Sequence, residues 1–114
     1  MGKPVVHFEI NAKDAKALQS FYGQLFDWSI NSDNEWNYGI VDTGGEGGIN
    51  GGIGPNPEAI GITFYVQVDD LQAYLDKAES LGAKTLMTPT EIPGAVTLAM
   101  FSDPEGNRIG MIKG

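Results

Sequence analysis

Cysteine is absent from the chain, and histidine occurs once, as His7. The lack of cysteine excludes a disulfide framework, a thiolate metal site and a cysteine nucleophile, and it agrees with a reducing cytoplasm. A serine triad would have to use His7, yet no Gly-x-Ser-x-Gly motif is present to expose a serine nucleophile. The glycine-rich segment 44–54 lacks the Lys-Ser/Thr of a phosphate-binding loop, and no helix pattern follows it. Cysteine chemistry is therefore excluded, and a serine triad and a phosphate-binding loop are not supported.

Basic residues are scarce, because seven Lys and Arg stand against fifteen Asp and Glu, for a net charge of -8. This charge repels phosphate backbones and anionic lipid surfaces, so nucleic acid and membrane are poor partners. No apolar run reaches the roughly 18 residues of a membrane-spanning helix, and the first residues show no apolar signal core. We expect one soluble, cytoplasmic domain.

The first half has the pattern of a strand, a helix and three more strands. Residues 5–10 alternate between two faces, which is typical of a half-buried strand and places His7 and Glu9 on its polar face. Asp14 is a typical N-cap, and an amphipathic helix follows it. Its apolar side is predicted to carry Ala17, Leu18, Phe21, Tyr22, Leu25 and Phe26, and its polar side Lys13, Lys16, Gln19 and Gln24. Short strands are predicted around residues 28–30, 36–41 and 49–53.

The stretch from Gly54 to Glu58 contains two prolines, which remove backbone donors, so it is predicted to end the strand and to link two modules. Beyond it the same order restarts, with a strand over 62–68, a helix opened by Asp69-Asp70 and a C-terminal cap at Gly82. The apolar side of this helix is predicted to carry Leu71, Tyr74, Leu75, Ala78 and Leu81. Strands are predicted near 84–87, 95–102 and 108–113, with the turn Asp103-Pro-Glu-Gly-Asn107 before the last.

The halves are related by a shift of 56 positions, which places His7 on Thr63, Glu9 on Tyr65 and Asp14 on Asp70. Each module has one sheet face covered by its helix and one open face, so two modules can combine their open faces into a cup. We predict an α+β fold of two βαβββ modules that form a curved mixed-sheet cup with helices on the outside. Module one spans about residues 5–54, the linker 54–60 and module two about 61–113, within one domain over 1–114.

Eight short motifs follow one another between residues 5 and 113: His7-Phe-Glu-Ile, Phe21-Tyr22, Phe26-Asp-Trp28, Gly47-Gly-Ile-Asn-Gly-Gly52, Val68-Asp-Asp-Leu71, Leu81-Gly82, Glu91-Ile-Pro-Gly94 and Asp103-Pro-Glu-Gly-Asn107. Each motif is common by itself, but the ordered set resembles the vicinal oxygen chelate superfamily of glyoxalases, bleomycin-resistance proteins and dioxygenases. Within it, the set is most similar to bacterial lactoylglutathione-lyase-related proteins. The resemblance implies a cup that is often completed by a homodimer.

The resemblance also implies where a divalent metal would bind. Metal-binding members typically place His, Glu or Gln at four positions, on the first and last strand of each module. Here these positions are His7, Thr63, Gly110 and either Gly51 or Gly52. A single donor holds a divalent ion poorly, so we predict no metal and no other cofactor. The alternative is a weak metal site of His7 with Glu9; otherwise both are polar residues satisfied by hydrogen bonds.

The open faces of the predicted cup carry the candidate ligand-binding residues. These are Thr63, Tyr65 and Gln67 on one strand, Arg108 and Gly110 on the last strand, and Trp36 and Tyr38 in the wall. Aromatic surface with a few polar groups suits a small organic ligand. Glycines 51, 52 and 110 are predicted to leave room where metal ligands would otherwise sit. A competing interpretation treats Trp28, Trp36 and Tyr38 as core or dimer-interface aromatics.

Two functions remain open. The first is a binding protein that holds a small aromatic or carbonyl ligand, and the acidic charge favours it slightly. The second is a metal-dependent or metal-free lyase, isomerase or dioxygenase-type enzyme, in which Glu9 or His7 acts as general base and Tyr65 or Arg108 stabilises an oxyanion. The sequence does not decide between them.

Overall fold

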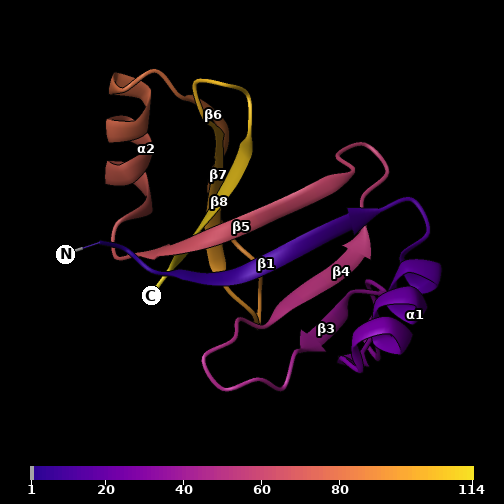
Figure 1. The fold of residues 1–114 in the computed structure, drawn as a ribbon. Coiled ribbons are helices and arrows are strands. Elements are labelled where there is room, and N and C mark those ends of the chain that lie inside the picture. Colours follow the sequence, from indigo (N-terminus) through magenta and orange to yellow (C-terminus); the bar gives the residue numbers. More distant parts are fainter. Residues whose placement is uncertain (1) are drawn as a thin grey trace. The chain divides into compact units, whose positions relative to one another are not determined.

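The computed structural model describes residues 2–114, which form two compact units (Figure 1). The N-terminal unit spans residues 6–63, and the C-terminal unit comprises residues 64–114 together with residues 2–5. The elements of the first half are β1 (Val5–Ala12), α1 (Ala15–Phe26), β2 (Ser29–Asn31), β3 (Gly39–Asp42) and β4 (Gly51–Pro55). Those of the second half are β5 (Gly61–Val68), α2 (Leu71–Ser80), β6 (Lys84–Glu91), β7 (Thr97–Ser102) and β8 (Arg108–Lys113). Each half is thus the βαβββ module that the sequence predicts, and the α+β fold class is confirmed.

The sheet of the N-terminal unit has the order β2-β3-β4-β1. β1 and β4 are parallel, whereas the other neighbours are antiparallel, so the sheet is mixed as predicted. Ile10, Val41 and Ile53 are buried beneath α1, with Leu18 and Tyr22 packed against them. Figure 1 shows α1 beside β3 and β4. Burial of each aliphatic side chain of this kind stabilises the fold by roughly 1.5–3 kcal/mol.

The sheet of the C-terminal unit has the order β5-β8-β7-β6, again with one parallel pair, β5 and β8. Its core lies under α2 and consists of Val68, Leu71, Leu75, Ala99 and Met111. β6 contains a proline, Pro89, and its register with β7 shifts once between Thr85 and Met87 and again across the proline, between Met87 and Thr90. Proline is tolerated there because β6 is the edge strand of this unit, where a missing backbone donor breaks no second ladder.

The two halves of the structure are related by the same shift of 56 positions. β1 and β5 have eight residues each and start 56 positions apart, and the helix caps Asp14 and Asp70 are separated by the same shift. Both carboxylates accept a backbone N–H three residues on, at 3.1 Å from Ala17 and 3.0 Å from Ala73. Both predicted N-caps are therefore confirmed.

No helix within residues 2–114 has the length and apolar character needed to cross a membrane.

Several predicted strand ends are wrong. β4 continues through Pro55, although the sequence predicted a strand that ends at Ile53. The N–H of Asn56 donates to the carbonyl of Ala12, so the backbone N–H of every second residue of this segment points toward β1. The backbone nitrogen of Pro55 points to the opposite side, toward β3. Because the pairing with β3 ends at Ile53, the missing N–H of Pro55 breaks no bond. β6 also continues to Glu91, four residues beyond its predicted end, as an edge strand paired with β7.

The buried face of α1 also differs from the prediction. Gln19, expected on the polar side, is 7% exposed, whereas Phe21, Leu25 and Phe26 are 54%, 57% and 54% exposed. The residues that pack inward are Ala15, Leu18, Gln19 and Tyr22, a stripe at helical spacing. Helical spacing alone did not show which of two apolar stripes meets the sheet. On α2, Leu81 is likewise 71% exposed rather than part of the packed face.

Candidate functional site

Three polar side chains of the N-terminal unit are joined by hydrogen bonds, and we call them the His7–Tyr38–Glu9 cluster. The Tyr38 hydroxyl lies 3.0 Å from His7 Nε2 and donates to Glu9 Oε2 at 3.1 Å. His7 and Glu9 alternate along β1 with Ile10, which packs under α1, so the cluster lies on the sheet face opposite the helix. Each of the three side chains is half-buried. The sequence predicted all three as candidate site residues.

The cluster fixes a proton on His7. The Tyr38 hydroxyl directs its own hydrogen at Glu9, so its oxygen accepts a hydrogen from His7, which must carry a proton on Nε2. Burial of the imidazole lowers the pKa of His7, and the nearby Glu9 charge offsets part of this effect. The neutral Nε2–H form of His7 therefore suits this arrangement at neutral pH.

Glycines of β4 make room for the Tyr38 ring. Gly52 lies opposite Glu9 in the parallel pair with β1, and a Cβ added to Gly52 would lie 1.9 Å from Tyr38 Oη. A Cβ on Gly54 would lie 2.6 Å from Tyr38 Cδ1. The ring therefore lies across the backbone of β4. The prediction that these glycines leave open space is wrong for Gly52, and Gly51 faces the ring of Phe8 instead.

The C-terminal unit repeats this arrangement. Tyr65 pairs with Gly110 between β5 and β8, and a Cβ on Gly110 would lie 2.3 Å from Tyr65 Cε2. Tyr65 is only 4% exposed. The space at Gly110 is therefore filled by a tyrosine ring, which again corrects the prediction of an open position.

The other predicted site residues have varied surroundings. Thr63 is buried, Gln67 is exposed, and Trp36 is 57% exposed on the segment before β3. The Arg108 guanidinium donates to Met100 Sδ at 3.4 Å. Among the candidates, the structure thus brings His7, Tyr38 and Glu9 together in one unit and Tyr65 and Gly110 in the other.

Asn34 is a site residue that the sequence reasoning missed. Its side-chain oxygen accepts the backbone N–H groups of Trp36 and Tyr38 at 3.1 and 3.0 Å. Its Nδ2 donates to the Tyr38 carbonyl at 2.7 Å. Asn34 therefore holds both backbone polar groups of Tyr38. The available signal was an asparagine in a polar turn, where its side chain commonly bonds nearby backbone groups.

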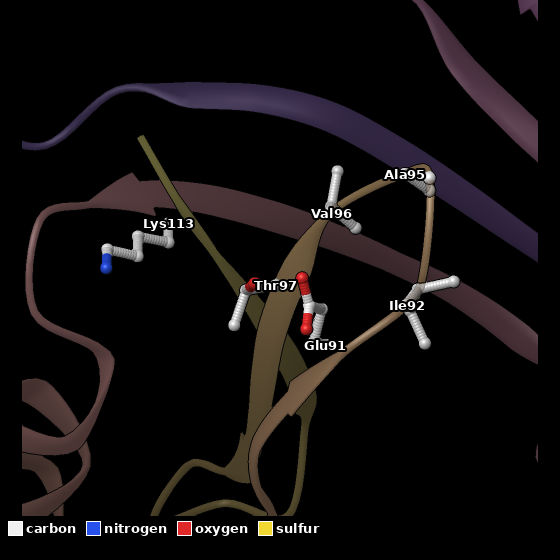
Figure 2. Close-up of a pocket in the computed structure, with 7 residues that line it drawn as sticks. Glu91, Ile92, Ala95, Val96, Thr97 and Lys113 are labelled. Atoms are coloured by element: carbon white, nitrogen blue, oxygen red, sulfur yellow. The ribbon is translucent and has the colours of Figure 1, made fainter.

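Two surface cavities lie away from the cluster. One, of about 320 Å³, is formed at the β6–β7 hairpin, where Figure 2 shows Thr97 between Glu91 and Lys113. The other, of about 410 Å³, lies at the start of α1 and includes Leu18, Phe21 and Ile60. Neither cavity is lined by His7, Glu9 or Tyr38.

Two βαβββ modules, each with a helix on one sheet face and a tyrosine over a glycine on the other, define a protein of the glyoxalase-like α+β class. The family model described as Glyoxalase/Bleomycin resistance protein/Dioxygenase superfamily matches residues 5–111, and the chain belongs to this superfamily.

Similar proteins agree with this assignment. The chain is 26% identical over 117 aligned residues to the anthracycline biosynthesis protein DnrV of Streptomyces peucetius, covering 87% of this chain and 42% of DnrV. It therefore spans less than half the length of that relative. A glyoxalase/bleomycin resistance protein/dioxygenase superfamily member from Vibrio splendidus has a TM-score of 0.68 at 14% identity, covering 99% of this chain and 100% of its own. Methylmalonyl-CoA epimerase from Mycobacterium tuberculosis has a TM-score of 0.69 at 15% identity, covering 96% and 86%. These two structures share the fold.

The residues at the positions implied for a metal do not fit a resident divalent ion. His7 Nε2 already bonds Tyr38, and Thr63 offers only a buried hydroxyl. At Gly52 and Gly110, tyrosine rings occupy the space that a ligand side chain would need. Within residues 2–114, no group of three or more His, Asp and Glu side chains is arranged to hold a metal ion.

Proposed function

We propose that this chain binds a small organic ligand, aromatic or carrying a carbonyl group, at the His7–Tyr38–Glu9 cluster and without a resident metal. The joined hydrogen bonds of the cluster carry the proposal, since half-buried donors and acceptors next to an aromatic ring suit such a ligand. The relationship to an anthracycline biosynthesis protein supports an aromatic ligand, because anthracyclines are fused-ring aromatics with carbonyl and hydroxyl groups.

The test is titration calorimetry of the purified chain with an anthracycline, with an aliphatic carboxylate of similar charge as comparison. Saturable binding of the anthracycline, weakened about tenfold in Tyr38→Phe, is the expected result, which corresponds to about 1.4 kcal/mol for a lost hydrogen bond. Gln24→Met serves as control, because Gln24 is exposed and bonds the exposed Ser20 hydroxyl. No binding by the wild type, or equal binding by Tyr38→Phe, would contradict the proposal.

Catalysis at the same cluster is the second candidate. The observation that favours it is a carboxylate, Glu9, bonded through a hydroxyl to an imidazole, which is a common way to position a general base. Glu9→Gln separates the two functions because it keeps the shape and removes the base. Loss of turnover with ligand affinity retained supports an enzyme, whereas loss of affinity in a chain without turnover supports a binding protein.

We also propose that the chain forms a homodimer through the outer face of α1, defined by Phe21, Leu25 and Phe26. Each of these side chains is more than half exposed, and Phe21 and Ile60 line the same cavity. Contiguous exposed apolar surface commonly marks an interaction site. DnrV is more than twice as long as the matched region, so it has room for a second such domain in one chain. A second copy of this chain is therefore the partner we propose. A cytoplasmic location stays a prediction from composition.

A further inference from the structure

We infer that Gly52 is a positioning residue that holds the Tyr38 hydroxyl between His7 and Glu9, by leaving the only space in which the ring can reach both. The inference rests on the proposed function for its effect on ligand binding. The position of the Tyr38 ring over Gly52 is a property of the folded chain and does not depend on a ligand.

Strand register places Gly52 next to Glu9. Gly52 stands beside Glu9 on β4, and Ile40 of β3 stands beside Gly52 on its other side. Side chains of paired residues project from the same sheet face, so a side chain at position 52 would stand immediately next to Glu9. The Tyr38 ring crosses this point to reach Glu9 and His7. Only glycine leaves that path open.

The contact distances identify which part of Tyr38 would move. A Cβ at position 52 would lie 1.9 Å from Oη, 2.0 Å from Cζ and 2.3 Å from Cε2, all at the far end of the ring. The backbone N–H and carbonyl of Tyr38 are both hydrogen-bonded to the Asn34 side chain. The same side chain also accepts the N–H of Trp36. An added methyl would therefore rotate the ring away while the backbone stays in place, which separates the hydroxyl from His7 and Glu9.

Tyr65 and Gly110 provide an internal comparison. Glu9 with Gly52 and Tyr65 with Gly110 are equivalent pairs in the two parallel ladders. Over Gly110 lies the ring of Tyr65, which is its paired residue. Over Gly52 lies the ring of Tyr38, which belongs to the segment before β3. Glycine on the last strand therefore admits a tyrosine ring in both modules, and in the first that ring joins an imidazole to a carboxylate.

The experiment compares Gly52→Ala with Gly45→Ala by NMR of the histidine ring. Gly45 is a matched control because an added Cβ there meets nothing within 4 Å. His7 is the only histidine, so its ring signals report the cluster without assignment of others. In Gly52→Ala we expect the His7 titration midpoint to move toward its ordinary value of about 6.5, because loss of the covering ring admits water. Gly45→Ala should leave the midpoint unchanged.

A second pair of variants keeps the inference testable if Gly52→Ala folds poorly. In a Tyr38→Ala background, the ring atoms nearest to a Cβ at position 52 are absent. Adding Gly52→Ala there should change neither the melting temperature nor the His7 titration midpoint. An equal effect of Gly52→Ala in both backgrounds, or an unchanged His7 midpoint in the single variant, would overturn the positioning role.

Ligand titration separates this inference from the proposed function. If the His7 midpoint moves in Gly52→Ala and the wild type binds the anthracycline, the variant should bind about tenfold more weakly, like Tyr38→Phe. If the midpoint moves but the wild type binds nothing, the positioning role holds and the proposed function fails. If the wild type binds but the midpoint stays, the proposed function holds and the positioning role fails.

Discussion

His7 changes its protonation equilibrium on folding, because the imidazole becomes half-buried next to Tyr38. Burial disfavours the charged ring and lowers its pKa, while the Glu9 carboxylate opposes that effect. The cluster therefore contributes a pH dependence to the stability of the whole chain.

We predict that His7 makes the protein less stable in mild acid. In the unfolded chain the ring takes up a proton near its ordinary value of about 6.5, whereas in the folded chain it does so at lower pH. The unfolded state thus binds more protons between these two values, so the stability is complete above the unfolded pKa and decreases as pH falls from there toward the folded pKa. Melting temperatures of the wild type and His7→Gln, followed from about pH 8 to about pH 5, measure this difference.

The wild type should lose more stability than His7→Gln across that range, because the other titrating groups are common to both proteins. Parallel curves for the two proteins would show that folding does not change the affinity of His7 for protons.

The three cluster residues could be predicted from the sequence, but their connection could not. Alternation along residues 5–10 places His7 and Glu9 on one polar face, and the family resemblance directs attention to that face. The contact with Tyr38 depends on the register of β4 against both β1 and β3. Register arises from long-range pairing, so the local sequence gave no sign that Gly52 lies under the Tyr38 ring.

The helix α1 is held on its sheet by hydrogen bonds from one polar side chain as well as by apolar contacts. The Gln19 amide donates to the carbonyls of Ile53 at 2.8 Å and Asn37 at 3.1 Å. A Cβ on Gly39 would lie 2.8 Å from the same amide. Gln19 thus joins α1, the middle of β4 and the segment that leads into β3.

We predict that Gln19→Leu lowers the free energy of unfolding by about 1–3 kcal/mol, because it leaves two carbonyl groups near the core without this donor. Urea unfolding measures the change. Gln24→Leu is the matched control on the same helix, since Gln24 is exposed, and it should change stability by less than about 0.5 kcal/mol. Similar losses in the two variants would mean that helix propensity, not the buried hydrogen bonds, accounts for the effect.

Elements that begin or end with a local signal were predicted well. Asp14 and Asp70 start their helices, and Gly82 follows α2 with a φ of 105°, which glycine adopts without strain. The turn at Asp103 is also local: its carboxylate accepts from the Asn107 side chain and from backbone N–H groups, which lowers the pKa of Asp103. The ends of β4 and β6 were predicted poorly, because neighbouring strands decide how far a strand remains paired.

At the scale of the whole molecule, we predict that a resident metal does not contribute to folding. The positions implied for metal ligands provide one imidazole that already bonds Tyr38 and two glycines covered by tyrosine rings. Treatment with a chelator should therefore leave the melting temperature unchanged, and elemental analysis should find far less than one divalent ion per chain. Stoichiometric zinc, nickel, manganese or iron, or a melting temperature that falls with chelator, would contradict the prediction and support a metal-dependent enzyme.

The last prediction concerns assembly through the outer face of α1. Phe21 and Leu25 lie one helical turn apart, and Phe26 follows directly, so a charge placed at Leu25 would enter the centre of this apolar face. We expect the wild type to behave as a dimer in light scattering coupled to gel filtration, and Leu25→Lys to behave as a folded monomer, since burying an unpaired ammonium at an interface is strongly unfavourable.

Leu81→Lys is the matched control, because Leu81 is 71% exposed at the end of α2 and outside the proposed interface. It should remain a dimer. Circular dichroism of both variants checks that each is folded. A monomeric wild type, or a Leu25→Lys variant that stays dimeric, would contradict a dimer formed through the outer face of α1. Equal dissociation by both lysines would show that added charge, rather than its position on α1, disrupts the dimer.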